Sequence, residues 1–152
     1  MSLLNVAVRS LPLVVTSSDR RRVVDITADV ERIVSEVSVV DGLVCIFCRH
    51  TTCGVVINEH EDGLIEDLFR CATDLIPDGY YAHDDLSRRT QNLQGPNEPA
   101  NGPAHVRQLL FGATSQIVPV VDGRLALGRW QKVLFVEFDT PRPRELLVSL
   151  LG

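Results

Sequence analysis

The sequence predicts an α+β fold in which an antiparallel, sandwich-like sheet core packs against about three helices. Apolar residues alternate with polar ones in several short segments and recur at helical spacing in others. These segments do not follow the strictly repeated strand and helix order of a parallel sheet. The 152 residues are about the length of one domain with its own core, so we expect a single domain over residues 1–152.

The N-terminal part is expected to form strands followed by a helix. Alternation over residues 3–9 and 11–16 indicates two strands, with a break near Pro12. Within residues 25–42, apolar side chains recur at positions i, i+3, i+4 and i+7, which predicts a helix with one apolar face. Thr27 is its expected N-cap, and Asp41-Gly42 ends it.

Two strands and two further helices are expected in the middle of the chain. Residues 43–49 ("LVCIFCR") and 54–58 ("GVVIN") are too short and too rich in β-branched residues for helices. Residues 62–75 again show helical spacing, and Pro77 stops the run. Residues 87–102 contain one large apolar residue, Leu93, so they are expected to form a surface loop or lid. Pro103 begins a short helix that ends before Gly112.

The last third of the chain is expected to be entirely β. Residues 115–121 and 124–127 flank Asp122-Gly123, which is typical of a tight hairpin turn. Residues 130–138 and 144–151 form two longer strands on either side of "DTPRP".

Composition excludes several functional classes. The net charge of -5, with acidic residues scattered, offers no basic face to a nucleic acid backbone. No apolar run has the length of a membrane span, and the N-terminus lacks the features of a secretion signal, so we expect a cytoplasmic protein. Cys45 and Cys48 lie three apart on an expected strand and point to opposite sides, so we interpret the cysteines as reduced core thiols.

Three of the four histidines lie where a strand or helix meets a loop. His50 ends a strand, His83 follows the second helix, and His105 opens the short helix. Imidazole is a common ligand of catalytic transition metals, so we predict a divalent metal site on these histidines, zinc-like rather than magnesium. The long spacing matches no local metal signature, and a purely structural role for each histidine is the alternative.

Other polar residues are candidates for the same site, each with a simpler alternative. Glu59 is a candidate base or a solvated loop acid, and Thr51 and Thr52 are candidate anion ligands or ordinary strand-end residues. Arg142 and Arg144 suit phosphate or carboxylate but also suit a soluble turn. Gln131 orients a substrate or makes an edge hydrogen bond, and Ser115 caps a strand or binds a ligand.

Several motifs together resemble those of the YjbQ-like family, also called UPF0047 or the secondary thiamine-phosphate synthase family. They are "HTT", "INE", "YAHDD", "NGPAHV", "GATSQIVPV", "DGRLALGRWQ" and "VEFDTPRPRE", between residues 42 and 152. The resemblance implies a YjbQ-like α+β fold and a homotrimer with pockets near subunit interfaces. It assigns site roles to the positions of His50, His83, His105, Glu59, Trp130, Gln131, Arg142 and Arg144.

The resemblance also implies an activity and shows two departures. The activity joins a pyrimidine diphosphate to a thiazole phosphate, giving thiamine phosphate and pyrophosphate. We therefore expect a metal-assisted enzyme on small phosphorylated metabolites, with His50, Glu59 and Gln131 as catalytic residues. A metal-dependent hydrolase at the same site and a non-catalytic small-anion-binding protein are the alternatives. The loop over residues 87–102 looks longer than is usual in the family, and Cys53 replaces a small, alanine-like residue.

Overall fold

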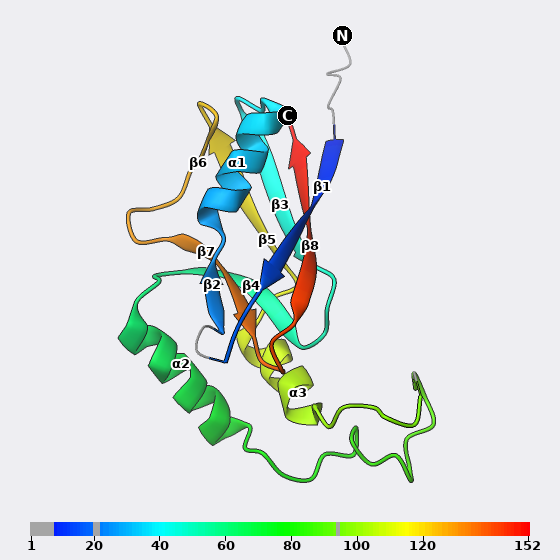
Figure 1. Ribbon diagram of the computed structural model, residues 1–152. Helices are drawn as coiled ribbons and strands as arrows, with labels where there is room; N and C mark the ends of the chain where they lie inside the picture. Colours follow the sequence, from blue (N-terminus) through cyan, green and yellow to red (C-terminus); the bar gives the residue numbers. More distant parts are fainter. Residues whose placement is uncertain (1–7, 20–21, 94) are drawn as a thin grey trace.

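Two antiparallel sheets face each other in the computed structural model, which describes residues 8–19, 22–93 and 95–152 (Figure 1). The larger sheet contains, in spatial order, β1 (Val8–Thr16), β8 (Pro143–Leu151), β3 (Gly42–Cys48), β5 (Ser115–Val121) and β6 (Arg124–Leu125). The smaller sheet contains β2 (Val23–Asp25), β7 (Lys132–Glu137) and β4 (Cys53–Asn58). The helices are α1 (Thr27–Val37), α2 (Asp62–Leu75) and α3 (Gly102–Phe111). The predicted α+β fold class is confirmed.

The main core lies between the two sheets. On β8 the alternate residues Leu146, Val148 and Leu150 are buried and meet Val55 of β4 and Phe135 of β7 in one cluster. Val30, Ile33 and Val34 of α1 join this cluster and close one end of the sandwich (Figure 1). The helical period predicted for this segment therefore has its apolar face in the core.

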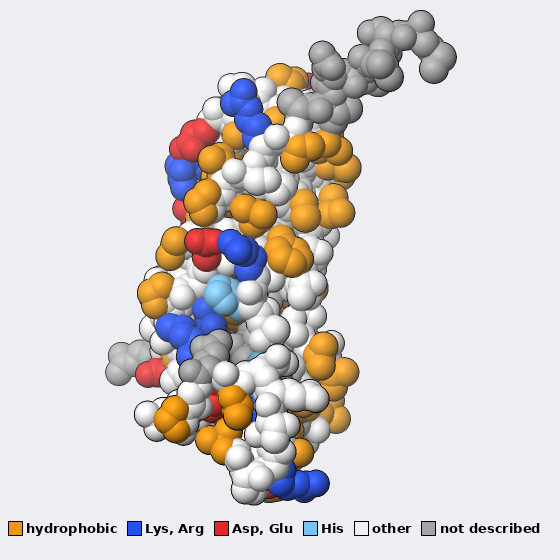
Figure 2. All heavy atoms as spheres, turned by 90° about the vertical axis from the view of Figure 1, so that its right-hand side faces the viewer, with side chains coloured by type: hydrophobic (Ala, Val, Ile, Leu, Met, Phe, Trp, Pro, Cys, Tyr) orange, Lys and Arg blue, Asp and Glu red, His pale blue; other side chains and the backbone are white. Residues whose placement is uncertain are grey.

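A second, smaller core lies on the other face of the three-stranded sheet. Val23, Leu134 and Val136 of this sheet pack with Ala104 of α3 and with Phe138. Partly buried residues of α2, among them Ile65 and Leu68, pack against the same cluster. The five-stranded sheet differs, because its outer face exposes large apolar side chains: Val14, Leu43, Phe47, Ile117 and Val121. Hydrophobic side chains gather on the upper part of the face that carries β1 and β8 (Figure 2).

Several local predictions are wrong. Helix α1 ends at Val37, before the predicted Asp41-Gly42, and Gly42 begins β3. Pro12 does not break the first strand, because β1 is an edge strand paired only with β8, where a missing N–H is tolerated; the predicted strand before residue 8 lies outside the described residues. Thr27 is the first helical residue, not the N-cap: its Oγ1 accepts a hydrogen bond from the Val133 N–H at 2.9 Å. The strand expected from residue 130 begins at Lys132, and the three-residue strand β2 was not predicted.

The turn and loop predictions are confirmed. Asp122 and Gly123 have φ values of 51° and 74°, as a two-residue hairpin turn with two left-handed residues requires, and Val121 pairs with Arg124. The described residues between α2 and α3, which exclude residue 94, form turns and bends but no helix or strand. None of the helices in the described part of the chain has the length and apolar character needed to span a membrane.

Candidate functional site

A cavity of about 620 Å³ collects most of the predicted site residues. His50 comes from the segment between β3 and β4, His83 from the loop after α2, and His105 from the first turns of α3. The wall also contains the predicted Thr51, Thr52, Arg142 and Arg144, together with Arg49, Arg89, Asn92, Glu98, Pro99 and Asn101. The segment between β3 and β4, the loop after α2 with the start of α3, and the residues around the start of β8 therefore meet at one cavity.

Asp84 fixes two of the histidines relative to each other. Its Oδ1 lies 3.1 Å from Nδ1 of His83 and accepts hydrogen bonds from the backbone N–H groups of Asn101 and Gly102, at 3.0 and 2.9 Å. Those N–H groups belong to the start of α3, which carries His105, and the His83 and His105 ring centroids are 4.4 Å apart. Because the carboxylate accepts from Nδ1, Nε2 of His83 is left as the nitrogen with a free lone pair.

His50 is oriented by the backbone of β8. Its Nε2 accepts a hydrogen bond from the Glu145 N–H at 3.0 Å. Burial, followed by the positive charge of Arg144, lowers the pKa of His50 below its ordinary value. Burial and the neighbouring His83 likewise lower the pKa of His105. Both imidazoles are therefore held in the neutral form, which accepts protons and binds metals.

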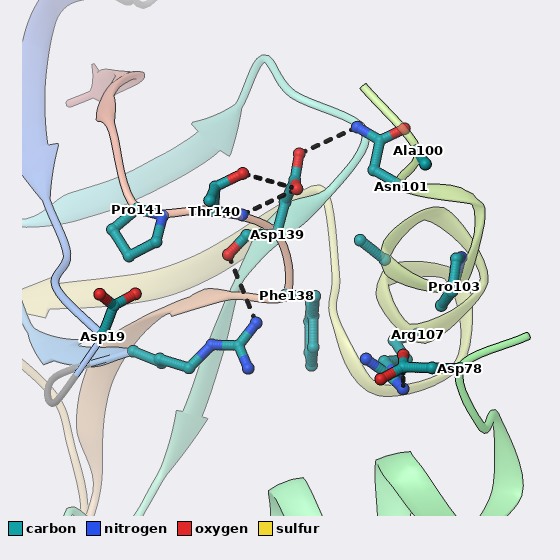
Figure 3. A pocket seen from close by; sticks show the side chains of 12 residues that line it. Asp19, Asp78, Ala100, Asn101, Pro103, Arg107, Phe138, Asp139, Thr140 and Pro141 are labelled. Atoms are coloured by element: carbon teal, nitrogen blue, oxygen red, sulfur yellow. Dashed lines mark hydrogen bonds and ion pairs between the residues drawn. The ribbon is translucent and has the colours of Figure 1, made fainter. Parts of the chain in front are cut away.

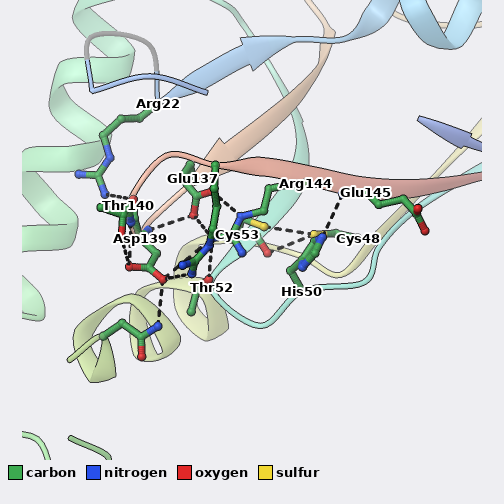
Figure 4. Close-up of polar contacts among 12 residues, drawn as sticks. Arg22, Cys48, His50, Thr52, Cys53, Glu137, Asp139, Thr140, Arg144 and Glu145 are labelled. Carbon is green, nitrogen blue, oxygen red and sulfur yellow. Dashed lines mark hydrogen bonds and ion pairs between the residues drawn. The ribbon is translucent and has the colours of Figure 1, made fainter. Parts of the chain in front are cut away.

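A buried ion pair holds Arg144 at the cavity wall (Figure 4). Its Nε and Nη2 donate to the two carboxylate oxygens of Glu137 at 2.7 and 2.8 Å, and Nη2 also donates to Thr52 Oγ1 at 3.1 Å. The Glu137 side chain is fully buried. Burial favours the neutral form of Arg144, but the bonds to Glu137 outweigh it and raise the pKa of the guanidinium. The pair is bidentate, so it fixes the guanidinium plane and with it the Thr52 hydroxyl.

The carboxylate of Asp139 orients the side chains of Arg142 and Asn101, as Glu137 orients Arg144. Its carboxylate accepts from Arg142, from Asn101 Nδ2 at 2.9 Å and from the Thr140 N–H at 2.7 Å. Burial alone would raise the pKa of Asp139, but the hydrogen bonds from Asn101 and Thr140 and the charge of Arg142 hold it below its ordinary value. On the far side of Asn101, a second polar cavity of about 410 Å³ contains Arg107 and Asp78 (Figure 3).

Three predicted site residues lie outside the histidine cavity. Glu59 lines a separate cavity between α2 and the three-stranded sheet. Gln131 forms a local turn, where its Oε1 accepts from the Gly128 N–H at 2.7 Å, and the adjacent Trp130 is 61% exposed. Ser115 is exposed at the start of β5 and pairs with Phe47. Residue type alone did not reveal these locations, because each depends on local turns or on the packing of α2.

The three histidines share the cavity but do not converge on one point. Among residues 8–19, 22–93 and 95–152, no three His, Cys, Asp or Glu side chains converge closely enough to hold a metal ion. The chemistry of the donors nevertheless suits a zinc-like ion: His50 and His105 are kept neutral, and His83 has the carboxylate partner that is typical of metal-binding histidines. His50 would bind through Nδ1, because its Nε2 is already engaged.

Sequence reasoning missed the acids that position the site. Asp84 follows His83 directly in "AHDD", which is the usable signal. Glu137 also had a sequence signal, because it is a single carboxylate that follows a run of apolar strand residues in "VLFVEF", and a buried carboxylate needs a charged partner. Asn101 and Asp139 lie within the motifs "NGPAHV" and "VEFDTPRPRE" but were given no role, and Arg89 lies in loop sequence with no comparable signal.

Comparison with known proteins identifies the family. The family model described as "UPF0047 protein YjbQ-like" matches residues 12–152. The chain belongs to the YjbQ-like (UPF0047) family. A UPF0047 protein from Archaeoglobus fulgidus is 41% identical over 142 residues, which cover 93% of this chain and all of the relative. The UPF0047 protein YugU from Bacillus subtilis is 33% identical, over 92% of this chain and 97% of the relative.

Solved structures of YjbQ-like proteins show the same fold. A YbjQ-like protein from Sulfolobus solfataricus aligns with a TM-score of 0.81 and 31% identity, covering 97% of this chain and 99% of the other. A protein from Aeropyrum pernix aligns with a TM-score of 0.79 and 35% identity, covering 95% of this chain and 98% of the other. The YjbQ-like fold expected from the motifs is thus confirmed.

Proposed function

We propose that this YjbQ-like protein is a cytoplasmic, metal-assisted enzyme that acts on small phosphorylated metabolites at the histidine cavity. Its reaction would resemble that of thiamine-phosphate synthase, in which a pyrimidine diphosphate is joined to a thiazole phosphate and pyrophosphate is released. The observation that carries the proposal is the meeting of three histidines, two threonines and four arginines at one cavity.

The arrangement of charges around the cavity supports a phosphorylated ligand. The carboxylates of Glu137 and Asp139 bind Arg144 and Arg142 but do not line the cavity. They orient the guanidiniums, whose remaining N–H groups, together with the hydroxyls of Thr51 and Thr52, are suitable donors to phosphate oxygens. Glu98 is the one acidic residue on the described wall, and it is paired with Arg89 at 3.8 Å.

The histidines would supply the chemistry. Movement of the side chains of His50, His83 and His105 toward one another would let them bind a zinc-like ion, which would act as a Lewis acid that offsets the negative charge of the leaving diphosphate. Where His105 is not bound to such an ion, its neutral imidazole is suited to accept a proton, a role for which Glu59 lies in the wrong cavity.

Two measurements test this proposal. Elemental mass spectrometry on protein purified without a metal-affinity tag is expected to find about one zinc-like ion per chain, lost in His105→Ala and kept in His60→Ala, the matched control on the histidine outside the cavity. Titration with pyrophosphate is expected to show roughly tenfold weaker binding for Arg142→Met, about 1.4 kcal/mol, and no change for the exposed Arg32→Met. Absence of pyrophosphate binding would refute the proposal.

A non-catalytic anion-binding protein is the second candidate. It is favoured by the positions of Glu59 and Gln131, which leave the cavity without two of the three predicted catalytic side chains. Turnover of a pyrimidine diphosphate with a thiazole phosphate, or hydrolysis of a phosphate ester, would establish an enzyme and separate transferase from hydrolase. Pyrophosphate binding without either reaction would favour the second candidate.

We also propose that the protein is a homotrimer. The exposed apolar side chains on the outer face of the five-stranded sheet support self-association, because monomeric proteins rarely expose a large continuous apolar patch.

A further inference from the structure

Two cysteines stand at the ends of a four-residue segment that lines the histidine cavity. Cys48 ends β3 and Cys53 begins β4, so the four residues between them include His50, Thr51 and Thr52. The two Sγ atoms lie 3.6 Å apart, and the Cys48 thiol also donates to the Cys53 carbonyl oxygen at 3.4 Å. Both are free thiols. The sequence pattern had drawn attention to Cys45 and Cys48 instead, whereas the fold brings together Cys48 and Cys53.

We propose that Cys48 and Cys53 form an oxidation site, at which a hydroperoxide converts the two thiols into a disulfide that weakens anion binding in the histidine cavity. The effect on binding rests on the proposed function, whereas formation of the disulfide does not.

The distance between the sulfurs suits this reaction. A disulfide bond is about 2.05 Å long, so the Sγ atoms need to approach by about 1.5 Å from their 3.6 Å separation. The two thiols are 1% and 0% exposed, which limits the oxidant to a water-sized molecule such as hydrogen peroxide and disfavours a bulky disulfide reagent. Local opening of the segment is needed for entry.

The chemistry balances without a cofactor. One thiol sulfur takes an oxygen from hydrogen peroxide as the O–O bond breaks, which gives a sulfenic acid and one water. The second sulfur then attacks the sulfenic sulfur, the S–O bond breaks, and the hydroxyl leaves with the second thiol's proton as another water. Two thiols are oxidised, one peroxide is reduced, and the products are one disulfide and two waters.

The disulfide would act on the cavity through Thr52. This residue accepts from Arg144 Nη2 through Oγ1 at 3.1 Å and from the Phe138 N–H through its carbonyl at 3.1 Å. At the other end of the segment, the Cys48 N–H donates to the Thr114 carbonyl at 2.7 Å. Drawing the sulfurs together would pull on both ends of residues 49–52, and the Thr52 contact with Arg144 lies directly next to Cys53.

Peptide mapping tests the first part. The full-length protein is treated with hydrogen peroxide, quenched with an alkylating agent in denaturant, and digested with trypsin, which cuts after Arg49 and separates the two cysteines. We expect a reductant-sensitive link between peptides 33–49 and 50–70. Because peptide 33–49 also contains Cys45, the link should persist in Cys45→Ser, and it should be absent from Cys53→Ala. A link that disappears in Cys45→Ser would overturn the proposal. Alkylation of all four cysteines after peroxide treatment would overturn it too, because it would show that no disulfide had formed.

Pyrophosphate titration of the reduced and the oxidised protein tests the second part. We expect about tenfold weaker binding after oxidation, and no effect of peroxide on Cys53→Ala. Equal affinities of the two forms would overturn the effect on the cavity. If neither form bound pyrophosphate while the link was present, the proposed function would fail and the oxidation site would stand.

Discussion

Arg144 is held inside the protein by Glu137, and this pair shows how single residues position the histidine cavity. Removing two charges from water is costly, and the cost is offset here by two short, parallel hydrogen bonds and a third to Thr52. The pair orients the site, because two hydrogen bonds to one carboxylate restrict the rotation of the Arg144 guanidinium.

Glu137→Gln is expected to lower the free energy of unfolding by about 3–5 kcal/mol, because Arg144 is left as a buried charge without its counter-ion. Urea unfolding at neutral pH measures the change. Glu145→Gln is the matched control: it breaks the exposed pair with Arg49 and should cost less than about 1 kcal/mol. Similar costs for both variants would show that the buried pair contributes no more than a surface pair.

Asp139 gives stability a defined pH dependence. Its folded pKa lies below the ordinary value of 3.8, so its contribution is complete above that value and is lost as the pH falls through the lower folded pKa. Asp139→Asn should therefore destabilise the protein by about 1–3 kcal/mol at neutral pH, and the difference from wild type should shrink below about pH 4. Unfolding curves at several pH values measure this. A difference that stays constant down to pH 2 would contradict the assignment, and the exposed Asp74→Asn should show little effect throughout.

At the scale of whole elements, periodicity predicted most of the fold. The helices and the longer strands follow from apolar spacing, because each has one face in a core. Strand β2 has only three residues, too few to show a period. Thr27 was misassigned because its hydroxyl serves a strand 106 residues away, a contact that no local pattern reveals.

Sequence predicted the site residues that stand at the ends of regular elements, but not those that tertiary contacts place. The histidines, threonines and arginines stand where regular elements end, so their side chains reach the same loops. Glu137 and Asp139 could not be paired with Arg144 and Arg142 in advance, because the chain must first bend between β7 and β8 for these side chains to meet. Gln131 and Glu59 lie outside the cavity because a local turn and the position of α2 direct them elsewhere.

The start of α3 offers a test at this scale. Asp84→Ala removes the acceptor of two N–H groups at the start of α3, which have no acceptor within the helix, and it removes the partner of His83. We therefore expect a loss of about 1–2 kcal/mol in the free energy of unfolding. If the histidines bind a metal, its affinity should also fall by roughly 10–100-fold. Thermal unfolding and metal titration measure the two effects. Asp85→Ala is the control, since the side chain of this neighbour forms hydrogen bonds only within its own loop; equal losses in both variants would remove the special role of Asp84.

At the scale of the whole molecule, the two faces of the sandwich differ. The three-stranded sheet carries α2 and α3, whereas the outer face of the five-stranded sheet leaves Phe47 and Ile117 at 42% and 62% exposure. Strand register places these side chains in neighbouring positions, because Phe47 pairs with Ser115 and Cys45 with Ile117. Burying this face against other copies would remove apolar surface from water at about 25 cal/mol per Å².

The homotrimer proposal therefore predicts a sedimentation mass of about three times 16.8 kDa for the wild type and a shift toward 16.8 kDa for Ile117→Lys. The lysine charge would be buried without a partner in any assembly that uses this face, whereas in the single chain it would remain in water. Leu75→Lys, which changes a similarly exposed side chain at the end of α2, is expected to leave the mass unchanged. A wild type that sediments at 16.8 kDa would contradict the trimer, and an Ile117→Lys variant that keeps the wild-type mass would show that assembly uses another surface.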